Sequence, residues 1–424
     1  QGISKNTELS TIKISKSDKT HTFDMKIKTG QGTIGIMVLF AIYSISMVTS
    51  LPGLAISPIL GDLETVFQKA SNLHLQMLES LPSFIIVPFI LIAGRLSLRL
   101  NKKKLLIAGL IIFFICSIIY PFVHRLNLLL VVSAFLGIGA GMVIPFSTGL
   151  IADYFTGARR TRQLGIASAI NNLTLVLATL LSGFLAGINW HYSFLVYCFS
   201  GISLFFAFFL DNTPPYVQST SLPSASDSHF GFKWPIKLML LYYFITFLAL
   251  TVPFNLSLYM QNLHIGNAEK SGTLISIFFL AVTLPGFDIN RVISWFKGYT
   301  NVISLAAISL GLVLFAFKSG ILLLTLGVIL IGLGYGIMQP IIYDKTANGV
   351  PTADATYALS LVMVMNYISI ITYPFILSWL SLDSAYFPFI LCMILGAAFT
   401  VFAFFRLNSK TLGMKQIQEN NNVK

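Results

Sequence analysis

Long apolar stretches separated by short polar connections occupy most of this chain. Six of them lie near residues 33–60, 77–98, 104–123, 127–152, 163–187 and 190–210, and six more lie near residues 234–260, 270–292, 300–317, 320–343, 355–380 and 386–405. Each stretch is close to the ~20 residues that a helix needs to cross the ~30 Å hydrocarbon layer of a membrane. The pattern therefore predicts an all-α polytopic membrane protein with twelve transmembrane helices.

Polar segments divide these stretches into two sets of six. Residues 1–32 carry six lysines and almost no apolar periodicity, which predicts an N-terminal tail. Residues 211–233 contain two adjacent prolines and several serines, as is typical of a linker. Residues 406–424 form a polar C-terminal tail. We therefore expect one six-helix bundle over residues 33–210 and a second over residues 234–405.

One glycine pattern occurs twice and indicates that the two halves are copies of one unit. The spacing G-x-G-x-G-x-x-x-P begins at Gly137 and again at Gly332, and Asn171 and Asn366 repeat at the same offset of 195 residues. Parallel repeats of this kind are typical of secondary transporters. Pairs of small residues four apart also let helix backbones approach closely in lipid. We expect such packing at Gly137, Gly141, Gly332 and Gly336.

Composition agrees with a membrane protein and excludes several other classes. Hydrophobic residues make up 55% of the chain, charged residues make up 10%, and the mean hydropathy is +0.81. Soluble domains carry about 25% charged residues. The net charge of +12 does not indicate nucleic-acid binding, because the positive residues lie mainly in tails and connections and form no basic face with stacking aromatics. The three cysteines lie in apolar runs without CxxC spacing, so we expect neither a metal site nor a disulfide framework.

Basic residues gather on the connections of one side, which predicts the orientation of the chain. The connections between the second and third helices and between the fourth and fifth hold Arg95, Arg99, Lys102, Lys103, Lys104, Arg159, Arg160 and Arg162. The opposite connections hold only the isolated cations Lys69, Arg125, Lys270 and Lys318. The positive-inside rule then places both termini in the cytoplasm, and the residue usage suggests a bacterial cell membrane. The first 32 residues are polar, so we expect no cleavable signal peptide.

Local motifs give the chain a resemblance to the major facilitator superfamily. The segment from Gly94 to Lys103 is similar to that family's loop motif G-x-L-x-D-R-x-G-R-K, although Leu98 replaces the Asp and Asn101 replaces the second Gly. The segment Trp190-His191-Tyr192-Ser193-Phe194 resembles the start of that family's sixth helix. The chain looks most like the drug:proton antiporter branch, but Ser133 stands where that branch carries an Arg in its fourth helix.

The resemblance implies the major facilitator fold and a secondary transporter that works by alternating access. Its expected partners are a small-molecule substrate, protons and the lipid bilayer, and the chain is expected to act as a monomer without cofactors or metals. Proton-coupled export of a small amphipathic compound is the preferred function. Uptake of a sugar, peptide or organic acid and a non-transporting membrane sensor are the alternatives. No ATP-binding G-x-x-x-x-G-K-[ST] motif and no hydrolase motif is present in the sequence, so we do not expect an enzyme.

Acidic residues within the apolar stretches are the first candidates for function. A charge at the centre of a membrane helix costs roughly 2.5 to 3.5 kcal/mol on insertion scales, so such residues are rare. Glu79 is the candidate for proton coupling, unless it lies in water at the outer interface. Asp344 is the second candidate, although the neighbouring Lys345 favours a local ion pair at the end of the tenth helix.

Amides and helix-end charges complete the predicted site. Proline and glycine interrupt the first helix at Pro52-Gly53 and the seventh at Pro253, and matching interruptions point to a binding site. The amides predicted to line the substrate cavity, with packing between helices as the alternative, are Asn171, Asn172, Asn255 and Asn366. The charges predicted to form a cytoplasmic gate, in which Asp153 would pair with Arg159 or Arg160, are Arg95, Arg99, Asp153, Arg160, Asp288 and Arg291.

Overall fold

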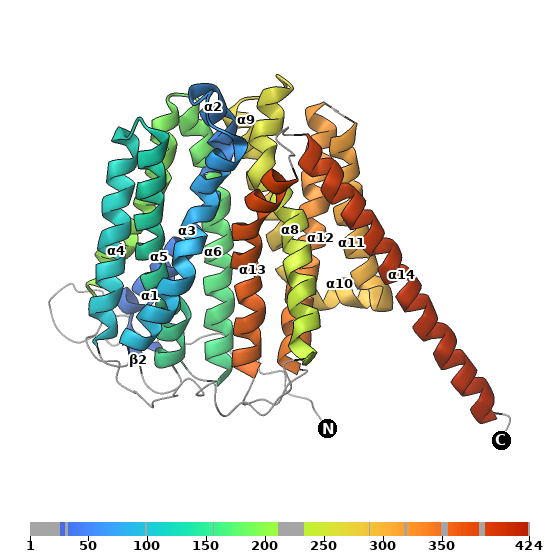
Figure 1. The fold of residues 1–424 in the computed structure, drawn as a ribbon. Coiled ribbons are helices and arrows are strands. Elements are labelled where there is room, and N and C mark those ends of the chain that lie inside the picture. The colour runs from blue at the N-terminus through green and yellow to red at the C-terminus, as the bar shows by residue number, and fades with distance from the viewer. Residues whose placement is uncertain are drawn as a thin grey trace, which may run out of the picture.

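The computed structural model describes residues 26–29, 33–97, 100–155, 157–210, 233–287, 289–317, 320–348, 355–380 and 386–422, and these residues are almost entirely helical (Figure 1). The elements of the first half are β1 (Lys26–Lys28), β2 (Thr33–Gly35), α1 (Ile36–Ser50), η1 (Leu54–Ile59), α2 (Leu60–Val66), α3 (Asn72–Leu96), α4 (Lys102–Ile119), η2 (Tyr120–Phe122), α5 (Leu126–Tyr154), α6 (Gly157–Ala186), η3 (Trp190–Cys198) and α7 (Phe199–Ala207). Those of the second half are α8 (Lys233–Asn262), α9 (Ala268–Phe287), α10 (Ile289–Phe296), η4 (Lys297–Tyr299), α11 (Thr300–Ala316), α12 (Ile321–Asn348), α13 (Ala355–Trp379) and α14 (Phe387–Asn422).

The apolar stretches of the sequence correspond to these helices. Among the described residues, 11 helices are long and apolar enough to cross a membrane, and the number rises to 12 if α1 and the bent segment that follows it form one span. The predicted all-α fold with twelve spans is therefore confirmed. Local signals set several helix ends: the side chain of Asn101, for example, caps α4 by accepting a hydrogen bond from the Lys103 backbone N–H at 2.9 Å.

The structure differs from the expected pattern at four places. The interruption predicted at Pro253 is absent, because α8 runs from Lys233 to Asn262 with this proline inside the helix. The first span is not one helix, because α1 ends at Ser50 and the chain continues through η1 and α2 after a bend of 47°. A short helix, α10, lies between α9 and α11, and Figure 1 shows it lying across one end of the bundle. Two short antiparallel strands pair Lys26 with Gly35, so β1 lies inside the segment that the sequence predicted to be a tail.

The glycine pattern of the sequence lies at equivalent helix crossings in the two halves. A Cβ atom added to Gly141 of α5 would come within 2.6 Å of the Phe89 side chain of α3. A Cβ added to Gly336 of α12 would come within 2.2 Å of the Val282 carbonyl oxygen of α9. Real Cβ atoms do not approach other atoms so closely, so the two crossings need glycine. Each half thus packs its Gly-rich helix against the equivalent neighbour.

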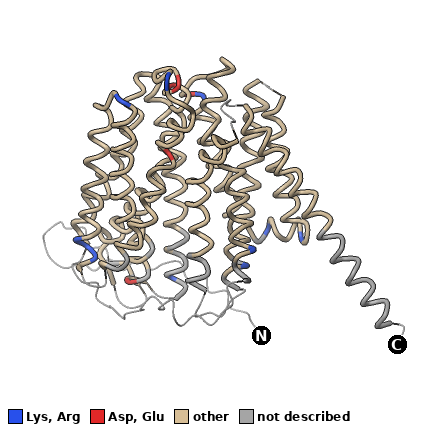
Figure 2. Tube along the Cα trace, in the orientation of Figure 1, with Lys and Arg blue, Asp and Glu red and all other residues tan. Residues whose placement is uncertain are grey.

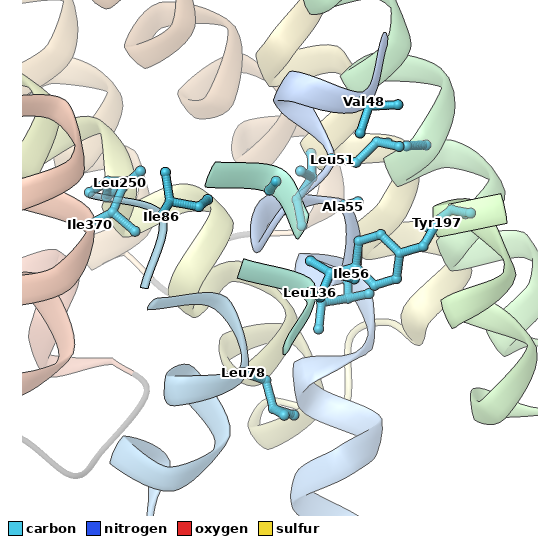
Figure 3. Close-up of a cluster of buried hydrophobic side chains, with 14 of the residues drawn as sticks. Val48, Leu51, Ala55, Ile56, Leu78, Ile86, Leu136, Tyr197, Leu250 and Ile370 are labelled. Atoms are coloured by element: carbon cyan, nitrogen blue, oxygen red, sulfur yellow. The ribbon is translucent and has the colours of Figure 1, made fainter. Parts of the chain in front are cut away.

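The two halves lie side by side and share one apolar core. The helices that contact each other across the boundary are α6 with α9, α3 with α13, and α2 with α8. In Figure 3, Ile86 of α3 lies beside Leu250 of α8 and Ile370 of α13, and all three are buried in one cluster. The contact between halves is therefore continuous with the core of each half.

Charged residues lie mainly near the two ends of the bundle, and its middle is almost free of them (Figure 2). We call the end that carries α2 and the connection from α8 to α9 the upper end, as it stands in Figure 1. The lower end carries the connection from α3 to α4. A charge in the middle of the bundle is therefore exceptional and needs a reason.

Candidate functional site

The break in the first span is held against α3 by a glycine. Gly53 has a φ angle of +85°, a conformation that side chains with a Cβ rarely adopt. A Cβ at this position would also lie 2.4 Å from the carbonyl oxygen of Glu79. The preceding Pro52 cannot donate a backbone hydrogen bond and favours the end of α1. The sequence signal Pro52-Gly53 thus places the broken end of the first span directly against the turn of α3 that carries Glu79.

The carboxyl group of Glu79 is fully buried and is not compensated by a hydrogen bond. Its side chain has 0% exposure, and among the described residues neither carboxyl oxygen has a hydrogen-bond partner. Ser57 of η1 lies next to it, but the Ser57 hydroxyl donates to the Leu54 carbonyl oxygen at 2.8 Å. Tyr197 of η3 and Tyr373 of α13 lie within electrostatic range of the carboxyl group. In this conformation Glu79 is therefore not a wetted residue of the outer interface.

A chain of buried hydrogen bonds crosses the boundary between the halves one turn above Glu79. The amide of Gln76 on α3 donates to the Asn255 side-chain oxygen of α8 at 3.0 Å and to the Phe254 carbonyl oxygen at 3.4 Å. The amide of Asn255 in turn donates to the Tyr373 hydroxyl at 2.5 Å. Above this chain lies a small pocket that is lined by Asn72, Leu73, Gln76, Asn255, Pro374, Leu377 and Ser378. Asn255 therefore joins the halves in this conformation, and its role in substrate binding stays a prediction.

The carbonyl oxygen of Pro58 anchors the upper part of the first span to the second half. It accepts hydrogen bonds from the hydroxyl of Ser257 on α8 and, at 2.9 Å, from that of Ser271 on α9. The backbone N–H of Gly61 donates back to the Ser257 hydroxyl at 3.0 Å. The pyrrolidine ring at residue 58 interrupts the helical hydrogen bonding of η1. The segment that follows the bend at Gly53 is thus joined to the other half.

The helices α6 and α9 close the upper end on the other side of the boundary. Gly183 and Gly272 face each other so closely that a Cβ on Gly272 would lie 2.8 Å from the Gly183 Cα. About one turn below, the hydroxyls of Thr179 and Ser276 share a hydrogen bond of 2.8 Å. This seam and the Pro58 contacts join the halves at the upper end. The described conformation is therefore closed at that end.

A cluster of tyrosines around one glutamine lies in the lower part of the second half. We call Tyr242, Tyr335, Gln339, Tyr343 and Tyr367 the tyrosine–glutamine cluster. The Tyr242 hydroxyl lies 2.9 Å from the Tyr343 hydroxyl and accepts a hydrogen bond from the Gln339 amide at 3.1 Å. Tyr335, Gln339 and Tyr343 are four residues apart along α12, so they share one helix face. These three side chains are half-buried, whereas Tyr242 is buried.

The remaining predicted amides are half-buried and lie in α6 and α13. Asn171 is 3.5 Å from the Thr49 hydroxyl of α1, which is a long hydrogen bond. Asn172 and Asn366 are also half-buried, and no hydrogen bond is described for either. These positions are compatible with a surface between the two halves, and their role in substrate binding stays a prediction.

The charges predicted to form a gate lie at the lower end where the structure describes them. Asp153 forms an ion pair of 2.7 Å with Lys102 of α4, whereas the sequence suggested Arg159 or Arg160. The reason is that α4 packs against α5, which brings Lys102 at the start of α4 close to Asp153 near the end of α5. The guanidinium of Arg291 lies 5.5 Å from the Trp295 ring centre. The residues or side chains that lie outside the described part of the chain are Arg95, Arg99, Arg160, Asp288 and Asp344.

No cluster of three or more metal-ligating side chains occurs within the residues that the structure describes. Cys116, Cys198 and Cys392 are free thiols there. Sequence reasoning missed Gln76 and the tyrosine–glutamine cluster. A signal for Gln76 was present, because Gln76 and Glu79 lie three apart in an apolar helix and so share one face.

Comparison with known proteins gives one family and several similar chains. The family model described as Major Facilitator Superfamily matches residues 34–374. The Quinolone resistance protein NorA of Staphylococcus aureus is 26% identical over 288 residues, which cover 63% of this chain and 70% of that protein. The Multidrug transporter protein MdtP of Bacillus subtilis is 28% identical over 160 residues, 38% of this chain and 28% of that one. Among solved structures, the nucleoside transporter NupG superposes with a TM-score of 0.66 at 16% identity, over 89% of this chain and 99% of that one, which shows the shared fold.

Proposed function

The chain belongs to the major facilitator superfamily and is a transporter rather than an enzyme, and on this premise we propose that it exports small amphipathic compounds in exchange for protons. The names of two relatives, a quinolone resistance protein and a multidrug transporter, support export. An aromatic cavity with a single acid favours export, whereas a cavity rich in amides and charges favours uptake of a nutrient. The tyrosine–glutamine cluster and the isolated Glu79 fit the first pattern.

The burial of Glu79 is the observation that carries the coupling proposal. An ionised carboxylate without hydrogen bonds in a dry interior costs several kcal/mol, so this conformation favours the protonated form. If the halves separate at the upper end, water reaches the carboxyl group and lowers that cost. Glu79 would then be open to proton uptake from the upper side, and closure around the protonated carboxyl group would carry that proton inward. A group whose preferred charge follows the conformation is what proton-driven transport requires.

The orientation of the chain supports proton uptake from the outside. The described basic residues of the lower end include Lys102, Lys103, Lys104, Lys237 and Lys345. At the upper end, the described cations Lys69, Arg125 and Lys270 are balanced by the acids Asp62, Glu64 and Glu269. By the positive-inside rule the lower end faces the cytoplasm of a cell membrane, with both termini on that side. The described conformation, closed at the upper end, then corresponds to the inward-facing state.

Flux measurements on purified protein in proteoliposomes test this proposal. A fluorescent quinolone is supplied outside vesicles that have an acidic lumen, and its accumulation is followed over time. The wild-type protein should concentrate the compound, whereas Glu79→Gln should allow only equilibration, because the amide keeps the shape but does not titrate. Glu269→Gln, which neutralises an exposed acid at the upper end, is the matched control and should behave as wild type. If Glu79→Gln accumulates the quinolone at the wild-type rate, Glu79 does not couple transport, and Asp344 or Asp288 becomes the candidate.

A further inference from the structure

The tyrosine–glutamine cluster combines aromatic rings with hydrogen-bonding groups and holds no charged side chain among its described members. The rings of Tyr242 and Tyr343 meet edge to face, with centres 5.4 Å apart and an interplanar angle of 62°. The hydroxyl of Tyr242 is saturated, because it contacts Tyr343 at 2.9 Å and Tyr335 at 3.4 Å and accepts from Gln339 at 3.1 Å. This hydroxyl therefore serves to orient its neighbours.

Other groups of the cluster keep hydrogen-bonding capacity that the described residues do not use. The Tyr335 hydroxyl makes only two long contacts of 3.4 Å, to Tyr242 and to Thr246. The amide nitrogen of Gln339 donates to two tyrosines, but no described group donates to its side-chain oxygen. The Tyr367 hydroxyl lies in electrostatic range of Tyr343, and no hydrogen bond to a described residue is found for it. Neither the Gln339 amide oxygen nor the Tyr367 hydroxyl is a buried atom without a partner, so both remain open to water or to a ligand.

The free groups share one surface that faces away from lipid. The lipid-exposed side of α12 is formed by Leu322, Leu323 and Leu326, which are more than 40% exposed. Tyr335, Gln339 and Tyr343 lie toward α8 and α13, because their partners Tyr242 and Tyr367 belong to those helices. The equivalent positions of the first half, 195 residues earlier, are Ala140, Ile144 and Thr148. These three positions of the first half thus carry no aromatic ring and no amide.

We propose that the tyrosine–glutamine cluster binds the transported compound and that this compound is a planar aromatic molecule with hydrogen-bonding groups and no permanent positive charge. Tyrosine rings stack on an aromatic ring, and the hydroxyl of Tyr335 and the amide oxygen of Gln339 bond to its polar groups. A permanent cation would enter a half-buried site in which no described carboxylate compensates its charge. This inference rests on the proposed transport function but concerns binding, which needs no gradient.

Equilibrium binding to purified wild-type protein in detergent, at fixed pH and without a gradient, tests the substrate class. The two probes are 7-amino-4-methylcoumarin, an uncharged planar compound whose amine donates and whose lactone carbonyl accepts hydrogen bonds, and ethidium, a planar permanent cation. The wild-type protein should bind the coumarin at least tenfold more tightly than ethidium. Equal or tighter binding of ethidium, or no coumarin binding up to millimolar concentration, overturns the proposed class.

Conservative variants test the site itself. Tyr335→Phe and Gln339→Leu should each weaken coumarin binding about fivefold, the usual loss for one hydrogen bond. Gln339→Glu supplies the missing negative charge and should tighten ethidium binding while it weakens coumarin binding. Tyr192→Phe, which removes an exposed hydroxyl at the upper end, is the control and should change neither affinity. Wild-type coumarin affinity in both Tyr335→Phe and Gln339→Leu overturns the site. A protein that binds the coumarin normally but does not accumulate substrate along the gradient would indicate a defect in proton coupling at Glu79, not in the binding site. The two proposals can therefore be refuted separately.

Discussion

Removal of the Gln76 amide should open the upper end of the transporter. Gln76 crosses the boundary between the halves, with 3.0 Å from its amide nitrogen to the Asn255 side-chain oxygen, and it is only 3% exposed. Gln76→Leu keeps most of the volume but removes this bond. In the closed state the variant loses a net ~1 kcal/mol for the bond, and the buried Asn255 oxygen left without a donor costs about 1 kcal/mol more. In the open state, water satisfies that oxygen.

The closed state should therefore lose about 2 kcal/mol relative to the open state, which corresponds to an increase of roughly 30-fold in the ratio of open to closed protein. A cysteine at Ser80 reports this change, because Ser80 is buried and lies one turn from Gln76 on the same face of α3. In a background without native cysteines, a membrane-impermeant thiol reagent added from the upper side should label Ser80→Cys up to 30-fold faster when Gln76→Leu is present.

An exposed bond between the same halves provides the control. The Asn262 amide donates to the Glu64 carboxylate at 3.2 Å, but water replaces this contact readily because Asn262 is exposed. Asn262→Leu should therefore change the labelling rate by less than about threefold. A labelling rate in Gln76→Leu within twofold of the parent would refute the reasoning, because it would mean that the Gln76 bond does not distinguish the two states.

Two further predictions concern packing and orientation. Gly141→Leu and Gly336→Leu should abolish flux while the chain remains inserted, because an added Cβ would lie 2.6 Å from an atom of α3 and 2.2 Å from an atom of α9, respectively. The control Gly286→Leu should keep flux, because a Cβ added there meets no atom within 4 Å. Normal flux in both Gly141→Leu and Gly336→Leu would show that these contacts are dispensable. In intact cells, a cysteine in place of Lys104 should react only with membrane-permeant thiol reagents, whereas one in place of Glu269 should also react with impermeant reagents. The two side chains are exposed at opposite ends of the bundle. The reverse labelling pattern would show that the proposed topology is inverted.

The sequence alone determined which segments cross the membrane and where the halves repeat. Apolar length is a local property, so the runs that became α3 to α6 and α8, α9 and α11 to α14 were visible without knowledge of their neighbours. The glycine spacing also predicted close helix packing from the sequence alone, because small residues four apart lie on one helix face. The signal Pro52-Gly53 identified the broken helix, although the sequence did not show that the break meets Glu79.

Only the tertiary structure decided what surrounds each polar residue. Gln76 and Asn255 are 179 residues apart in the chain, and no spacing rule joins two residues on opposite halves. The sequence was equally consistent with Glu79 in water at the membrane interface and with Glu79 buried in the bundle. The structure shows that η1, η3 and α13 cover it. Asp153 pairs with Lys102, which lies 51 residues away in the chain and on another helix. The physical reason is the same in each case: hydropathy fixes how deep a residue lies, but burial and hydrogen bonding depend on which distant helices pack against it.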